Sequence, residues 1–145
     1  MDIREFRPED LDQCAEILMA VYNNPLWQCR WTHETAKAYL KDYADAAKFV
    51  GYAAIDGQTV IGAILAHEKI WWNNAEVFID EMFVLPQYQG QGIGSTLLKT
   101  LETYVKERGL AGFTLTTNRY APAPDFYKKN GFAVCEPIIM MAKEC

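Results

Sequence analysis

Glycines alternate with other residues in the segment Gln89-Gly90-Gln91-Gly92-Ile93-Gly94-Ser95-Thr96, which stands between an apolar run and a helical pattern. Residues without a Cβ allow consecutive backbone N–H groups to come close together, and such groups can bind a pyrophosphate at the positive end of the following helix. The alternative is a glycine turn that serves only tight packing between a strand and a helix. The segment is therefore a candidate anion-binding loop.

Two common phosphate-binding loops do not fit this segment. A dinucleotide fingerprint, G-x-G-x-x-G, needs its third glycine at position 95 or 97, where the sequence has Ser95 and Leu97. A P-loop needs a lysine before its final Ser or Thr, and no lysine precedes Ser95 or Thr96. The sequence thus argues against both classes of nucleotide site.

Composition restricts the class of protein further. With 145 residues, half of them apolar, the chain can bury one core, so we expect a single domain over residues 1–145. The formal charge of -5 and the lack of a basic stripe argue against nucleic-acid binding, and no apolar run is long enough to span a membrane. Four scattered cysteines, with no C-x-x-C pair, suggest reduced thiols, no metal site and a cytoplasmic location.

The first half of the chain predicts two helices and an antiparallel hairpin. A short strand near residues 3–6 precedes a helix with apolar residues at helical spacing from Leu11 to Val21. An aromatic loop over residues 22–31 leads to a second helix, which Thr32 can cap. Residues 49–55 and 59–67, joined by Asp56-Gly57, have the pattern of a hairpin.

The second half predicts the elements around the glycine loop. A strand over residues 76–85, apolar on both faces, ends at Pro86, and the loop opens a helix that stops at Gly109. Residues 113–117 predict another strand, residues 125–129 a short helix, and residues 132–141 a last strand.

Two motifs resemble those of the GNAT superfamily of N-acetyltransferases. Gln89-x-x-Gly92-x-Gly94 is similar to the family's R/Q-x-x-G-x-G/A loop, and Tyr127-x-x-x-Gly131-Phe132 looks like its Y-x-x-x-G-F motif. The order of elements also matches from residue 2 to about 143. The resemblance implies an α/β (α+β) fold of the GNAT type, with a mixed, mostly antiparallel sheet and helices on both faces.

The resemblance also implies acetyl-CoA as co-substrate. In the family the strand before the loop pairs its backbone with the pantetheine arm, which here assigns Met82, Phe83 and Val84. Residues 89–96 would bind the pyrophosphate. Asn118 corresponds to a residue near the pantetheine arm, although it lies nine residues before Tyr127, farther than usual.

Catalysis in such enzymes needs a base, because an alkylamine is almost wholly ammonium at pH 7. Asp80 and Glu81 are the candidates, and alternation along a strand predicts that they lie on opposite faces. Asp80 shares its parity with the family's usual base positions and is preferred over Glu81. By the family pattern Tyr127 protonates the departing thiolate. We expect direct attack in a ternary complex. A covalent acyl-cysteine route would need a cysteine beside a base, and the two histidines, His33 and His67, look like ordinary helix and strand residues.

Clustered aromatic residues suggest the acceptor. The regions that form the acceptor cleft in the family contain Tyr22, Trp27, Trp31 and Trp72, with Asp80 nearby, and aromatic rings attract ammonium groups or stack on sugars. Core or dimer contacts are the alternative role for these rings. The Ile79-Asp80 step also resembles some aminoglycoside 6'-N-acetyltransferases.

The favoured acceptor is a small-molecule amine, aminoglycoside-like or polyamine-like. Protein or peptide N-acetylation, and a CoA-binding regulatory domain without catalysis, remain open. The acidic balance disfavours charged tRNA as a substrate. Many relatives are dimers, so a homodimer is compatible with the resemblance.

Overall fold

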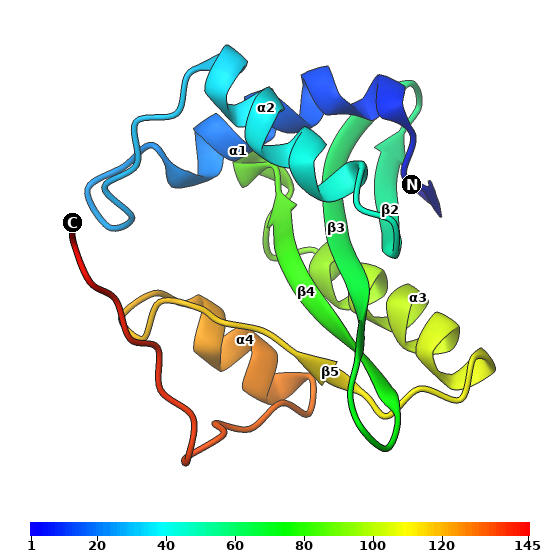
Figure 1. The fold of residues 1–145 in the computed structure, drawn as a ribbon. Coiled ribbons are helices and arrows are strands. Elements are labelled where there is room, and N and C mark those ends of the chain that lie inside the picture. Colours follow the sequence, from blue (N-terminus) through cyan, green and yellow to red (C-terminus); the bar gives the residue numbers. More distant parts are fainter.

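The structure, a computed structural model, describes all residues 1–145. Its elements follow in the order β1 (Asp2–Glu5), a 3-10 turn (Pro8–Asp10), α1 (Leu11–Tyr22), α2 (His33–Ala44), β2 (Phe49–Asp56), β3 (Thr59–Ile70), β4 (Ala75–Val84), a second 3-10 turn (Pro86–Tyr88), α3 (Ile93–Glu107), β5 (Phe113–Thr114) and α4 (Ala123–Lys129) (Figure 1). None of these helices is both long enough and apolar enough to cross a bilayer.

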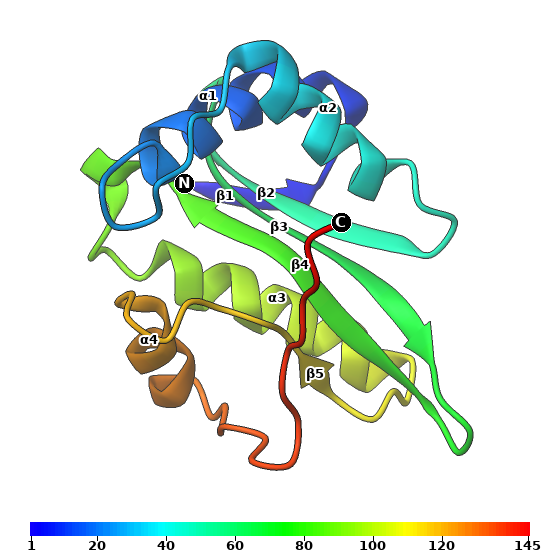
Figure 2. The same ribbon diagram turned by 60° about the vertical axis from the view of Figure 1, so that its left-hand side comes forward.

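The five strands form one sheet in the order β1-β2-β3-β4-β5. All neighbours are antiparallel except β4 and β5, which are parallel. Helices α1 and α2 cover one face of the sheet, and α3 and α4 cover the other (Figure 2). This arrangement confirms the predicted fold, a mixed, mostly antiparallel sheet with helices on both faces.

Local sequence signals account for the ends of several elements. Helix α2 starts after Thr32, whose hydroxyl accepts a hydrogen bond from the N–H of Thr35, as expected of an N-cap. The β2–β3 hairpin turns at Asp56-Gly57, and Gly57 has a φ of 64°, which a residue without Cβ adopts without strain.

Alternating side chains of the central strands supply two cores. Leu65 of β3 packs with Leu18 and Leu40 beneath α1 and α2. Its neighbour Ile64 packs on the opposite face, with Leu97 of α3. Because β3 is buried on both faces, its position is fixed, and so is that of its partner β4.

A β-bulge in β4 changes the expected orientation of two acidic residues. Leu65 pairs with Glu81 and Ala66 pairs with Ile79, so Asp80 is an extra residue without a partner on β3. Both carboxylates therefore lie on the face covered by α1 and α2. The prediction that they lie on opposite faces was wrong, because strict alternation does not hold across a bulge.

Strands β4 and β5 separate after only two pairs, at Val77–Phe113 and Phe78–Thr114. Residues 115–117 were predicted as strand, but they leave the sheet. The separation exposes one backbone edge of β4 beyond Phe78 and opens a space between the two strands.

The predicted last strand, residues 132–141, is absent. Phe132 stays anchored on the sheet because its ring stacks on Phe113 with centroids 5.8 Å apart. Beyond it, Pro137 lies in a turn in which the N–H of Ile138 donates to the carbonyl of Cys135. Proline fixes φ and has no N–H for a ladder, so this turn interrupts the apolar run.

Candidate active site

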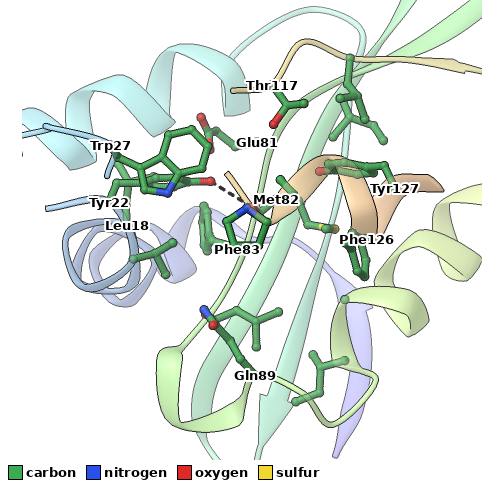
Figure 3. A pocket seen from close by; sticks show the side chains of 18 of the residues that line it. Leu18, Tyr22, Trp27, Glu81, Met82, Phe83, Gln89, Thr117, Phe126 and Tyr127 are labelled. Atoms are coloured by element: carbon green, nitrogen blue, oxygen red, sulfur yellow. Dashed lines mark hydrogen bonds between the residues drawn. The ribbon is translucent and has the colours of Figure 1, made fainter. Parts of the chain in front are cut away.

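The space between β4 and the segment after β5 is a cavity of about 850 Å³. Its wall includes residues from α1, the α1–α2 loop, α2, β4, the glycine loop and α4. Figure 3 shows Tyr22 and Trp27 on one side of β4, and Phe126 and Tyr127 on the other. The cavity is the natural candidate for the site, since it brings together most of the residues selected from the sequence.

The open edge of β4 presents backbone groups to the cavity. The N–H of Leu85 donates to the carbonyl of Ile61 at 2.8 Å. The backbone N–H and C=O groups of residues 81, 83 and 85 therefore point toward β3. Met82 and Val84 consequently direct their N–H and C=O groups to the open edge, and both line the cavity. The structure thus places two of the three predicted pantetheine-binding residues, Met82 and Val84, at an unpaired strand edge, whereas the backbone of Phe83 faces β3.

Side chains already bond to the two carbonyls on this edge. The hydroxyl of Tyr22 donates to the Met82 carbonyl at 3.3 Å, and the amide of Gln89 donates to the Val84 carbonyl at 2.9 Å. The N–H groups of Met82 and Val84 stay available to acceptors on a ligand.

The glycine loop ends at the start of α3, which lacks a side-chain cap and has no acidic residue in its first turn. Gly90 and Gly92 have φ of 78° and 80°, a backbone conformation that other residues rarely adopt. The first N–H groups of α3 therefore remain free for an anion.

Most of the loop faces the cavity. The residues that line it are Gln89, Gly90, Gly92, Ile93, Gly94 and Ser95. Two others bond locally and are not part of the wall. The Gln91 amide donates to the carbonyl of Gln87 at 3.5 Å, and the Thr96 hydroxyl donates to the carbonyl of Gly92 at 2.9 Å.

Tyr127 projects from α4 into the cavity and packs edge-on against Phe126 and Phe132. Burial raises its pKa to about 12, and the nearby charge of Glu81 adds to this effect. The phenol is therefore protonated at neutral pH and can donate a hydrogen bond or a proton.

Glu81 is held in the cavity by a tyrosine. The hydroxyl of Tyr39, from α2, donates to its Oε2 at 2.6 Å. Burial raises the pKa of Glu81, whereas the hydrogen bond from Tyr39 opposes that rise. A carboxylate with a raised pKa is a stronger base than one in water.

Asp80 also lines the cavity but is bound to a histidine. Its Oδ2 lies 2.7 Å from Nδ1 of His67 on β3, and its side chain is 5% exposed. Burial raises the pKa of Asp80, and the hydrogen bond with His67 opposes that rise. His67, which looked like an ordinary strand residue, thus belongs to the surroundings of the site.

Aromatic rings form the wall nearest to α1 and α2. Tyr22 and Trp27 meet edge-to-face at 4.9 Å, and Trp31 lies 4.8 Å from Tyr39. The lining contains two carboxylates but no lysine, arginine or histidine. The cavity is therefore apolar and acidic, which favours a cationic ligand.

Besides Gln91 and Thr96, two further residues selected from the sequence lie outside the cavity. Trp72 is 85% exposed at the tip of the β3–β4 hairpin. The side-chain oxygen of Asn118 accepts a hydrogen bond from the N–H of Tyr120 and supports a turn instead. Thr117, its neighbour, lines the cavity in its place.

Sequence reasoning missed the roles of Tyr39, Phe126 and Thr117. Tyr39 lies in the second helix that the sequence predicted, and its contact with Glu81 depends on the bulge in β4, for which the sequence has no local signal. Phe126 stands directly before the Tyr127 motif and could have been found there. No cluster of three or more His, Cys, Asp or Glu side chains is positioned to hold a metal ion.

A family model described as "Acetyltransferase (GNAT) family" matches residues 11–132 of the chain. A curated relative, the streptothricin acetyltransferase of Streptomyces lavendulae, is 34% identical over 93 residues, which cover 63% of this chain and 47% of that protein. The chain thus spans about half the length of this relative. An uncharacterized N-acetyltransferase of Archaeoglobus fulgidus is 30% identical over 113 residues, covering 74% of this chain and 76% of that one.

Solved structures show the same fold. AAC(6')-Iy in complex with the bisubstrate analog CoA-S-monomethyl-acetylneamine matches with a TM-score of 0.76 at 18% identity, covering 99% of this chain and 98% of that one. At this identity the likeness concerns the fold alone. The family model confirms the family that the two sequence motifs indicated.

Proposed function

The chain belongs to the acetyltransferase (GNAT) family, and we propose that it transfers the acetyl group of acetyl-CoA to a primary amine of a small molecule. One observation carries this proposal: a single cavity contains a free strand edge, an uncapped helix N-terminus, a protonated phenol and a buried carboxylate. These groups suit, in turn, a pantetheine arm, a pyrophosphate, a thiol leaving group and an amine.

The residues present fit acetyl-CoA, which supplies the activated acyl group as a thioester. The N–H groups of residues 90–95 at the start of α3 would hold the pyrophosphate. The N–H groups of Met82 and Val84 would bind pantetheine carbonyls in the manner of an added strand.

For the base we propose Glu81 ahead of Asp80, which reverses the order expected from strand parity. Glu81 and Tyr127 line the same cavity and Glu81 makes its hydrogen bond to a neutral tyrosine, whereas one oxygen of Asp80 is bound to His67. The carboxylate of Glu81 would take a proton from the ammonium group and leave the lone pair that attacks. Asp80 would then contribute negative charge that attracts the cation.

Tyr127 would act on the leaving sulfur through a hydrogen bond. A phenol with a pKa of about 12 is a weaker acid than an ordinary thiol, whose pKa is about 8.5. Full proton transfer to a thiolate would therefore be unfavourable, whereas a hydrogen bond would still stabilise the charge that develops on sulfur. This refines the expected role of Tyr127 as an acid.

The acceptor we propose is a compact polyamine-like or aminoglycoside-like cation without a carboxylate near the reacting amine. Asp80 and Glu81 attract ammonium groups, and the rings of Tyr22 and Trp27 can flank them. Because no cationic side chain lines the cavity, an acceptor carboxylate there would have no partner and would be repelled. The streptothricin acetyltransferase relative is consistent with a small-molecule acceptor.

The test is an amine panel with acetyl-CoA and a free-thiol readout. Cadaverine and lysine form a matched pair, since they differ by one carboxylate. We expect kcat/KM to be at least about tenfold higher for cadaverine, equivalent to about 1.4 kcal/mol of transition-state stabilisation. Turnover of peptides but not of polyamines or aminoglycosides would contradict the small-molecule proposal, and acetyl-CoA binding without any turnover would favour a regulatory domain.

We further propose a homodimer, since several large apolar side chains are exposed on the C-terminal segment: Val134, Ile138, Ile139, Met140 and Met141. A second copy that covers these side chains would remove them from water. Sedimentation at micromolar concentration tests this, and a strictly monomeric protein would contradict it. The cytoplasmic location stays a prediction.

A further inference from the structure

Two tyrosines from different helices reach consecutive residues of β4 directly after the bulge. Tyr39 of α2 donates to the Glu81 side chain at 2.6 Å, and Tyr22 of α1 donates to the Met82 carbonyl at 3.3 Å. The two contacts differ in kind, because one is made to an ionisable group and the other to the backbone.

The ring of Tyr39 is held by its neighbours. It lies 4.8 Å from the ring of Trp31 and 5.0 Å, edge-to-face, from that of Tyr43. The next residue, Leu40, is completely buried in the core beneath α2. The hydroxyl therefore has a fixed position relative to β4, and its hydrogen bond costs little further ordering of the side chain.

We infer that Tyr39 is a positioning residue that holds the Glu81 carboxylate in its charged form and in one orientation toward the reacting amine. This inference rests on the proposed function, in which Glu81 accepts the proton of the acceptor. Tyr39 would act through Glu81 and would not touch the acetyl donor.

The groups around Glu81 explain why such a residue is needed. Burial raises the pKa of Glu81, and the charge of Asp80, beside it on β4, adds to the rise. Tyr127 of α4 is a protonated phenol and brings no positive charge, and His67 of β3 is bound to Asp80. Among these groups, Tyr39 alone donates a hydrogen bond to the Glu81 carboxylate, and this bond favours the charged form of Glu81.

Tyr39 is suited to be a permanent donor. Burial and the adjacent charge of Glu81 raise the pKa of its phenol, so the hydroxyl stays protonated wherever the enzyme is active. A short O–H···O⁻ bond of this kind is among the stronger hydrogen bonds in proteins.

The test is Tyr39→Phe, which keeps the ring contacts with Trp31 and Tyr43 and removes only the hydroxyl. Without its donor the Glu81 carboxylate is less stable, so the acidic limb of kcat/KM for the amine should move up by about one pH unit. At a pH below the limb kcat/KM should fall about tenfold, while the Kd for acetyl-CoA stays within about twofold. A limb that moves by less than about 0.3 units would overturn the inference.

A second readout needs no activity. Carbon-13 NMR of protein labelled at glutamate carboxyls gives the titration of Glu81 directly. The signal of Glu81 is assigned as the one that disappears in Glu81→Gln. An upward shift in Tyr39→Phe supports the inference even if no amine is acetylated, in which case the proposed function fails alone. An unchanged titration in an active enzyme overturns the inference alone.

Tyr104→Phe is the matched control. Tyr104 of α3 donates to Glu68 at 2.7 Å, so it forms the same kind of pair on the opposite face of the sheet, away from the cavity. Its loss should leave both the pH profile and the Glu81 titration unchanged. A shift as large as that of Tyr39→Phe would show that the effect is general and would overturn the inference.

Discussion

The ring of Phe126 lies against Gly94 so closely that a Cβ at position 94 would come within 3.1 Å of its Cζ atom. This contact joins the glycine loop at the start of α3 to α4. The next residue on α4 is Tyr127, so the loop and the phenol are positioned relative to each other by a side chain that requires glycine. The third glycine of the loop thus serves packing, whereas Gly90 and Gly92 serve backbone conformation.

Gly94→Ala should therefore impair catalysis through α4. The added methyl group displaces Phe126 and with it Tyr127, and we expect kcat to fall about tenfold. Stability should change by no more than about 2 kcal/mol, because overpacking is partly offset by the helix propensity of alanine. Steady-state kinetics and thermal unfolding measure both. A second change, Phe126→Leu, should restore part of kcat, and failure of this rescue would argue against the packing explanation.

Gly92→Asp should abolish binding of acetyl-CoA. At a φ of 80° any side chain is strained, and the carboxylate would stand where the loop is expected to receive the pyrophosphate. Gly57→Asp is the control, because Gly57 also has a positive φ, 64°, but lies in the β2–β3 turn. Calorimetry should detect binding in the control and none in Gly92→Asp. Equal affinities would mean that the loop is only structural.

Much of this architecture was readable from the sequence because the signals were local. The Asp56-Gly57 turn, the Thr32 cap and the glycine loop each specify their own conformation. The prediction of a last strand over residues 132–141 failed because apolar residues form a strand only where a neighbouring strand can pair with them. The turn at Pro137 removes this apolar segment from the sheet.

The site was harder to predict than the fold, because its geometry depends on features without a local signal. The bulge at Asp80 arises from pairing with β3. His67 of β3, which bonds to Asp80, is 13 residues away in the sequence. Tyr39 reaches Glu81 across 42 residues. The motif residues Tyr127 and Gly92 both line the cavity, whereas the relation of Asp80 to Glu81 required the structure.

Glu81→Gln should remove the acidic limb of the kcat/KM profile. The amide cannot accept a proton, and we expect kcat/KM at neutral pH to fall about 10² to 10⁴-fold, the usual contribution of a general base. Because burial raises the pKa of Glu81, the wild-type limb should lie above the ordinary range for glutamate. Activity is then lost as the pH falls through that pKa.

Asp80→Asn is the matched comparison for the same measurement. It should raise the acceptor KM through loss of negative charge but keep the acidic limb. If the limb disappears in Asp80→Asn and persists in Glu81→Gln, the base is Asp80, as strand parity first indicated.

Tyr127→Phe should lower kcat far more than it changes the KM for acetyl-CoA, since a hydrogen bond to sulfur matters mainly as charge develops there. The loss of one such donor is worth about 10² in kcat. Because the pKa of Tyr127 is about 12, the wild-type profile should show no basic limb from this residue below about pH 11. Rates within twofold of wild type would exclude this role or show that chemistry is not rate-limiting.

Trp27→Ala and Trp72→Ala should separate the aromatic residues of the cavity from those of the surface. Trp27 lines the cavity and contacts Tyr22 at 4.9 Å, so its loss should raise the acceptor KM by about 2- to 30-fold, as expected for a cation–π contact of about 0.5 to 2 kcal/mol. Trp72 is 85% exposed on the β3–β4 hairpin, and its loss should leave both the kinetics and the stability at the wild-type level. A raised acceptor KM in Trp72→Ala alone would show that the acceptor reaches the hairpin and that the cavity wall is not its binding site.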